Sequence, residues 1–116
     1  MSDETALEAK AVGHGAQAAL DAVVRFGGAK VGDKTLVDAF MPFVASLGAE
    51  IERGQRLASA WQIAAAAATQ AAAATAQLTP KLGRARPHAA RSVGHPDAGA
   101  VSLALCARIV GEAIGK

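Results

Sequence analysis

The feature that most constrains the fold is a run of helix-forming residues between Gln55 and Thr79 that contains neither glycine nor proline. Alanine, glutamine, leucine and arginine all favour helix, so the run predicts a long helix from about Gly54 to Leu78. Because alanine carries a single methyl group, neighbouring helices can approach this segment to near the short end of the ~8–10 Å range of interaxial distances. We therefore expect this helix, which carries Trp61, to lie at the centre of a helical bundle.

Two amphipathic helices are expected before the central one. In residues 6–26 apolar side chains recur close to the spacing i, i+3, i+4, and the glycine pair that follows can end the helix with left-handed backbone. Asp33 is expected to cap a second helix that stops at Gly48 and is kinked by Pro42. The predicted core residues are Leu7, Ala11, Val12, Ala18, Ala19, Ala22 and Val23 in the first helix and Leu36, Val37, Phe40, Val44 and Leu47 in the second.

A fourth helix is expected from Ala100 to Ile114, after a loop from Lys81 to Gly99 that is rich in glycine and cations. Cys106 is expected to pack on its core face as a small residue. No segment alternates apolar and polar residues with the period of two that strands require. The chain is thus predicted to be all-α, one domain spanning residues 1–116 and built as an antiparallel bundle of about four helices. The expected core residues of the last helix are Val101, Leu103, Leu105, Ile109 and Val110.

Composition and charge exclude several classes of function. A net charge of +2 is too small for a general binder of nucleic acid or of membrane surfaces, and 3% aromatic residues offer little base stacking. The alanine-rich segment is too weakly apolar for a membrane span. With Cys106 as the single cysteine and an acidic N-terminus, we expect a cytoplasmic chain without a membrane or nucleic-acid partner. Its 31 alanines bury so little apolar surface that oligomerisation is expected.

The glycine-rich loop from Gly27 to Thr35 superficially resembles a phosphate-binding loop. Glycines followed by Lys and Thr at the start of a helix can present backbone amides to an anion. In a P-loop, however, the Lys follows the last glycine directly and a strand precedes the loop, whereas here Asp33 intervenes and a helix precedes. From the residues alone, a capped turn between two helices is the favoured interpretation and a ligand loop is the alternative.

The second loop carries four cations from Lys81 to Arg91 and no acid before Asp97. A charge run of this kind usually forms solvated surface. Arginines whose backbone is held by glycine and proline could instead bind phosphate in a bidentate manner, so an anion site is the alternative. Asp97 can cap the last helix. The histidines near Asp97 lack the further ligands that a zinc site needs, and no metal site is predicted.

Three sequence blocks occur in order along the chain. The first is Gly32-Asp33-Lys34-Thr35-Leu36-Val37-Asp38, the second is Gly83-Arg84-Ala85, and the third is Arg91-Ser92-Val93-Gly94-His95-Pro96-Asp97-Ala98-Gly99-Ala100. In order and separation these blocks resemble the nucleotide-binding, L-type domain of the dihydroxyacetone (glycerone) kinases, from about Val12 to the C-terminus. The resemblance implies an all-helical barrel that binds ADP or ATP at one end, of which this chain corresponds to the C-terminal half.

The resemblance also implies which residues contact the nucleotide. Leu36 would pack against the base, with Thr35 beside it, and Arg84 would offset phosphate charge. Backbone amides at the start of the last helix would donate to an oxygen of the ligand. Two departures from the family pattern are small, since Gly28 replaces a residue that often has a side chain and Ala98 replaces the usual proline. The nucleotide-binding set implied in this way is Gly27, Gly28, Thr35, Leu36, Arg84, Asp97, Ala98 and Gly99.

The Mg²⁺-binding half of the family's domain has no counterpart in this sequence. Its Asp-x-x-x-x-Asp-x-Asp cluster is absent, because Asp33 and Asp38 share only the first spacing and Phe40 occupies the third position. Phosphoryl transfer relies on a metal to neutralise developing charge, so the chain is expected to be inactive alone. Mg²⁺ is therefore a cofactor of the family for which we find no ligands here.

The resemblance implies one function, and the missing cluster keeps a second one open. In the first, the chain is the nucleotide-binding domain of a dihydroxyacetone kinase-like phosphotransferase, and the phosphoryl group passes from ATP or a phosphorylated carrier protein to a small ketone or polyol. The expected partner is either a second copy or a chain that supplies the missing half-domain, and a subunit that holds dihydroxyacetone is a further possible partner. The alternative is a non-catalytic helical interaction or regulatory module.

Overall fold

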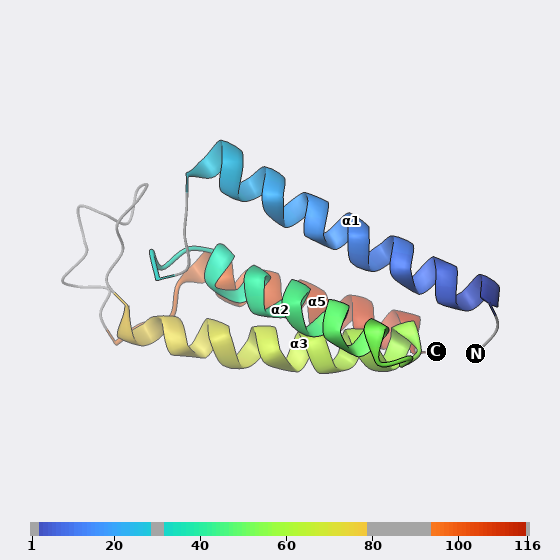
Figure 1. Cartoon of the computed structure of the whole chain (residues 1–116). Coiled ribbons are helices and arrows are strands. Elements are labelled where there is room, and N and C mark those ends of the chain that lie inside the picture. The colour runs from blue at the N-terminus through green and yellow to red at the C-terminus, as the bar shows by residue number, and fades with distance from the viewer. Residues whose placement is uncertain (1–2, 29–31, 79–93, 116) are drawn as a thin grey trace.

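The computed structural model describes residues 3–28, 32–78 and 94–115, and within them it contains helices and turns but no strand (Figure 1). The helices are α1 (Asp3–Gly27), α2 (Val37–Glu52), α3 (Leu57–Ala74) and α5 (Ala98–Ile114), and a short 3-10 helix, η1 (Thr75–Gln77), extends α3. Successive α-helices alternate in direction. The all-α prediction and the antiparallel arrangement are therefore confirmed.

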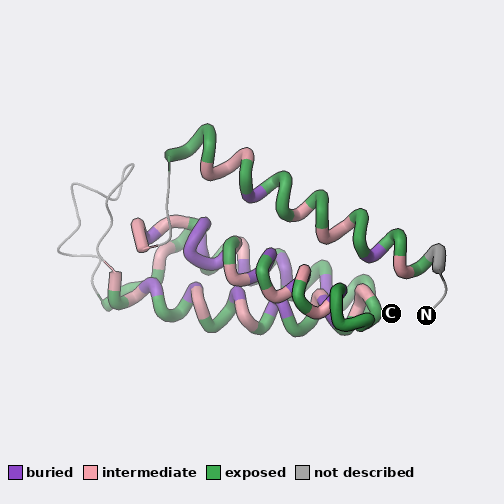
Figure 2. Tube along the Cα trace, viewed as in Figure 1, coloured by how far each residue is buried: buried purple, intermediate pink, exposed green. Residues whose placement is uncertain are grey.

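The core lies where α2, α3 and α5 pack against one another, and α1 packs mainly on α2 (Figure 2). The buried residues of α3 are all alanines, and those of α5 are alanines and one glycine. Large side chains in the core come mostly from α2. The buried set is Ala60, Ala64, Ala65, Ala68 and Ala72 of α3, Ala100, Ala104, Ala107 and Gly111 of α5, and Val37, Phe43, Val44, Leu47 and Ile51 of α2.

Trp61 joins the three core helices at one point. Its ring meets Phe43 of α2 edge-on, with centroids 4.9 Å apart and planes at 76°. Its indole nitrogen donates to the carbonyl oxygen of Ala107 at 2.7 Å. A Cβ atom placed on Gly111 would lie 2.9 Å from the Cδ1 atom of Trp61, so only glycine fits there without a shift. The predicted central position of α3 is confirmed, and this aromatic contact sets how closely α5 approaches it.

The end of α2 differs from the prediction. Helix α2 does not stop at Gly48 but continues to Glu52, because the apolar pattern extends to Ile51, which is 7% exposed. Burial of Ile51 outweighs the roughly 1 kcal/mol that glycine costs inside a helix. The chain turns instead at Gly54, whose φ of 86° is left-handed. Helix α1 ends at Gly27 as expected, and Gly28 follows with a φ of 71°.

The predicted core face of α5 is wrong. Val101, Leu105, Ile109 and Val110 are exposed, and Leu103 is only partly buried. The alanine face of α3 admits a close neighbour, so α5 turns its small residues inward and its large residues flank the contact. Cys106, which was expected in the core, is exposed.

The contact face of α1 is narrower than predicted. Ala9 and Leu20 are its buried residues, Val12 and Val23 are partly buried, and Leu7 is 68% exposed. One neighbouring helix covers only a thin stripe of α1, which leaves most of the predicted face in contact with solvent. No helix in the described part of the chain is long and apolar enough to cross a membrane.

Candidate functional site

The turn before α2 is organised by Asp38, the second residue of that helix. Both of its carboxylate oxygens accept backbone amides: Oδ1 from Gly32 at 2.5 Å and Oδ2 from Thr35 at 2.9 Å. The side chain is buried, with 6% of its residue surface exposed. Asp33 was expected to cap α2, but the residue at the cap position is Leu36, without a side-chain cap bond. Asp38 reaches back from inside the helix to the turn before it, and the two amides that it accepts belong to that turn and not to the helix.

The backbone of this turn departs from ordinary helix and strand geometry. Gly32 has a φ of 97°, and Lys34 has a φ of 60°, which is uncommon for a residue with a side chain. Lys34 is nevertheless 4% exposed. The hydroxyl oxygen of Thr35 accepts the amide of Val37 at 3.2 Å, and α2 begins there. A left-handed residue held in a buried position indicates that the surrounding contacts determine the shape of the turn.

The start of α5 is tied to the end of α3. Asp97 caps α5 as predicted, because its Oδ2 atom accepts the amide of Ala100 at 2.8 Å. The amide of Asp97 itself donates to the hydroxyl oxygen of Thr75 at 2.7 Å. Next to it, the amide of Gly94 donates to the carbonyl oxygen of Ala76 at 2.6 Å. These bonds hold the segment that enters α5 against η1.

The structure brings two of the three sequence blocks into contact. A Cβ atom placed on Gly99 would lie 3.5 Å from the Cβ atom of Leu36 and 3.7 Å from its amide nitrogen. Leu36 is 37% exposed, so part of its side chain is open to solvent beside the start of α5. Within the described residues, no hydrogen bond reaches the amides of Ala98 and Gly99. An apolar side chain and the positive end of a helix thus lie side by side.

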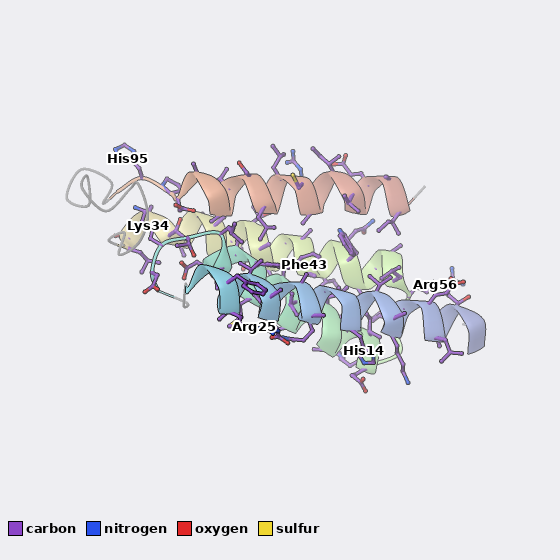
Figure 3. The ribbon with its side chains drawn as sticks, turned by 90° about the horizontal axis from the view of Figure 1, so that it is seen from above. His14, Arg25, Lys34, Phe43, Arg56 and His95 are labelled. Atoms are coloured by element: carbon purple, nitrogen blue, oxygen red, sulfur yellow. The ribbon has the colours of Figure 1, made fainter. Side chains whose placement is uncertain are left out.

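Of the other predicted nucleotide-binding residues, the structure describes Gly27 and Gly28 but not Arg84. Gly27 and Gly28 are exposed at the end of α1, at the same end of the bundle as the starts of α2 and α5 (Figure 1). Figure 3 shows Lys34 and His95 at this end, whereas His14 and Arg56 lie towards the opposite end. Arg84 and the other loop cations between Lys81 and Arg91 lie outside the described residues, and their contribution stays a prediction.

Two apolar grooves are lined in part by residues of α5. An apolar groove of about 290 Å³ between α3 and α5 is lined in part by Pro96, Val101 and Leu105. A second groove of about 280 Å³, lined in part by Phe43, Trp61 and Cys106, lies between α1 and α5. In residues 3–28, 32–78 and 94–115 no three His, Cys, Asp or Glu side chains are grouped as metal ligands would be. The described residues therefore provide no cluster of protein ligands for a metal ion.

Sequence comparison places the chain among known proteins. The sequence model of the DAK2 domain matches residues 1–112. The chain is 51% identical over 107 residues to D-erythrulose kinase of Mycolicibacterium smegmatis. The aligned residues make up 92% of this chain and 18% of that protein. It is 52% identical over 105 residues to L-erythrulose kinase of Pectobacterium atrosepticum. Here the aligned residues make up 90% of this chain and 18% of that protein.

A shorter relative comes from Escherichia coli. The PEP-dependent dihydroxyacetone kinase, ADP-binding subunit DhaL, is 37% identical over 83 residues, which cover 72% of this chain and 40% of that protein. The chain therefore spans less than a fifth of the two erythrulose kinases and about two fifths of the bacterial ADP-binding subunit.

Proposed function

The chain belongs to the DAK2 domain family, and we propose that it binds ADP or ATP as the nucleotide-binding part of a phosphotransferase that acts on a small hydroxyketone. Its relatives support this proposal, since one is named an ADP-binding subunit and two are named erythrulose kinases. Dihydroxyacetone and erythrulose share a ketone with an adjacent hydroxymethyl group, so the acceptor is proposed to be of this chemical class.

The observation that carries the proposal is the contact between Leu36 and the start of α5. The exposed part of Leu36 offers an apolar surface to an adenine ring. The amides of Ala98 and Gly99, at the positive end of α5, are suited to donate to an anionic oxygen. A base and an oxygen of the same nucleotide can therefore be held by two neighbouring segments. Gly27, Gly28 and Thr35 are proposed to line the same end, and Arg84 to offset the phosphate charge.

Catalysis is proposed to need more than this chain. The described residues do not provide a cluster of metal ligands, and phosphoryl transfer depends on neutralising the charge of the phosphates. A second polypeptide segment, in a partner or in another copy, would supply the metal ligands, and a kinase subunit would hold the ketone. ATP or a phosphorylated carrier protein would be the phosphoryl donor. The protein is proposed to act in the cytoplasm.

The proposal is tested by calorimetric titration of the chain with ADP, with and without Mg²⁺. We expect saturable binding at micromolar concentrations. Arg84→Ala is expected to weaken binding by roughly tenfold, since a guanidinium that pairs with phosphate is lost. Arg53→Ala is the matched control, because Arg53 is exposed beyond the far end of α2 and pairs there with Glu50 at 3.2 Å. A chain that remains folded and gives no heat of binding at millimolar ADP would refute the proposal.

A non-catalytic interaction module is the second candidate, and one observation favours it. Large apolar residues are exposed on more than one side of α5, since Val101 and Leu105 share one face of the helix and Val110 lies nearly opposite Val101. A helix that is apolar over most of its circumference is usually covered on more than one face. Light scattering distinguishes the candidates in combination with the titration, because a stable oligomer that binds no ADP would support the interaction module alone.

A further inference from the structure

Thr75 is a buried polar residue that is not among the proposed nucleotide contacts. It is the first residue of η1, directly after α3, and its exposed fraction is 1%. A buried hydroxyl needs partners, because leaving a polar group unpaired in the interior costs stability. The Thr75 hydroxyl donates to the carbonyl oxygen of Ala72 at 2.5 Å. Its only proton is used there, so its remaining capacity is to accept.

The accepted bond comes from the segment that enters α5. The amide of Asp97 donates to the Thr75 oxygen at 2.7 Å, across 22 positions of sequence. One residue further along, the carbonyl oxygen of Ala76 accepts the amide of Gly94. The helix η1 ends at Gln77, and the chain is bonded to the same turn again at Gly94. The hydroxyl of Thr75 determines where the Asp97 backbone lies.

The position of Asp97 determines the position of the proposed ligand contacts. Asp97 is the cap of α5, and its side chain accepts from Ala100, so the first turn of the helix moves with it. Gly99 in this turn contacts Leu36, where a Cβ atom on the glycine would be 3.5 Å from that of Leu36. A shift of Asp97 therefore changes the spacing between the amides of the helix start and the apolar side chain.

We infer that Thr75 is a positioning residue for the nucleotide, which acts by fixing the Asp97 backbone so that the start of α5 faces Leu36 at the spacing the ligand requires. This inference rests on the proposed nucleotide-binding function. The relevant group is the hydroxyl and not the bulk of the side chain. Replacement by a residue of the same shape without a hydroxyl should therefore weaken nucleotide binding, whereas a residue that keeps the hydroxyl should not.

The test uses the whole chain with ADP as the probe. Thr75→Val keeps the shape and removes the acceptor, and it is expected to weaken ADP binding by about tenfold, in line with the loss of one buried hydrogen bond. Thr75→Ser keeps the hydroxyl and is expected to bind ADP within about twofold of the unmodified chain, since it retains that bond. Hydrogen exchange at the Asp97 amide gives a second readout and should be faster in Thr75→Val than in Thr75→Ser.

Thr69→Val is the matched control. Thr69 lies on α3, which η1 extends, and its hydroxyl donates to the carbonyl oxygen of Ala65 at 2.9 Å without bonding to the segment that enters α5. Its replacement should leave both ADP affinity and Asp97 exchange unchanged. Circular dichroism establishes that each variant is folded at the temperature of titration. If Thr75→Val does not fold, Thr75→Cys replaces it, because the thiol is a weak acceptor of similar size and should also bind ADP less tightly.

The outcomes separate this inference from the proposed function. If the unmodified chain does not bind ADP, the proposed function fails and the inference fails with it. If the unmodified chain binds ADP and Thr75→Val, or Thr75→Cys in its place, binds equally well, only the inference is overturned. Equal weakening in Thr75→Ser and Thr75→Val would also overturn it, because the hydroxyl would then not be the group that matters.

Discussion

Two buried polar residues, Asp38 and Thr75, shape the backbone on the two sides of the candidate site. Asp38 folds the turn before α2 by accepting two amides, and Thr75 fastens the entry to α5 by accepting one. Neither residue needs to touch a ligand to affect binding. Both act by satisfying amides that would otherwise be unpaired in the interior, which is costly in free energy.

Asp38→Asn should destabilise the fold. The carboxylate accepts one amide on each oxygen, whereas a carboxamide has one oxygen and would point an NH₂ group at the other amide. We expect the free energy of unfolding to fall by about 1–3 kcal/mol, as for a lost buried hydrogen bond, measured by urea denaturation. Asp21→Asn is the control, since Asp21 is exposed and accepts from the exposed side chain of Gln17. Equal effects of the two changes would contradict the role given to Asp38.

The candidate site could be predicted from the sequence only in part. Asp97 was identified as a cap because an Asp before a helical segment is a local signal, and the structure confirms it. The role of Thr75 has no local signal, because its partner is 22 residues away. Asp38 is inside a helix, where sequence patterns do not indicate that its side chain turns back. The remaining nucleotide contacts were implied by resemblance and stay proposals.

At the level of helices, the small residues of α3 and α5 determine how the bundle is packed. The alanine-rich run predicted the central helix correctly, since helix propensity and the absence of breakers are local properties. The core face of α5 was predicted wrongly because burial was assigned to the largest residues. Which face of a helix is buried depends on the neighbour, and an alanine surface selects small residues opposite it.

Gly111→Ala should destabilise the fold although alanine is the better helix former. The added Cβ atom would lie 2.9 Å from the Trp61 ring, which is held by Phe43 and by its bond to Ala107. Overpacking of this kind costs about 1–3 kcal/mol, which exceeds the gain of roughly 1 kcal/mol in helix propensity. We expect a lower melting temperature in a thermal scan followed by circular dichroism.

Gly48→Ala provides the matched comparison. Gly48 is also inside a helix, but a Cβ atom there would meet nothing within 4 Å. The substitution should therefore raise the free energy of unfolding by about 0.5–1 kcal/mol, the propensity difference alone. If both glycine variants were stabilised, Trp61 would not limit the approach of α5.

For the whole molecule, the exposed apolar residues of α5 predict self-association. Leu105 is 45% exposed and Ile109 is 54% exposed, on a helix that packs inward through small residues. We expect the mass measured by light scattering to rise with concentration. The double variant Leu105→Glu, Ile109→Glu should shift this rise to higher concentration, because charges would be buried in the contact. Leu7→Glu on α1, at a residue that is 68% exposed, should not. A constant monomer mass for the unmodified chain would contradict the prediction.

The contact between Leu36 and Gly99 joins segments that lie far apart in the sequence, and this has a consequence for how the protein is made. Contacts between α1 and α2, and between α2 and α3, join neighbours in the chain and can form early, whereas the contact with α5 closes a much longer loop and is expected to form later. On a ribosome, α2 and α3 can pair before α5 has emerged from the exit tunnel. Under the proposed function, affinity for ADP would therefore arise during synthesis only when α5 docks on α2.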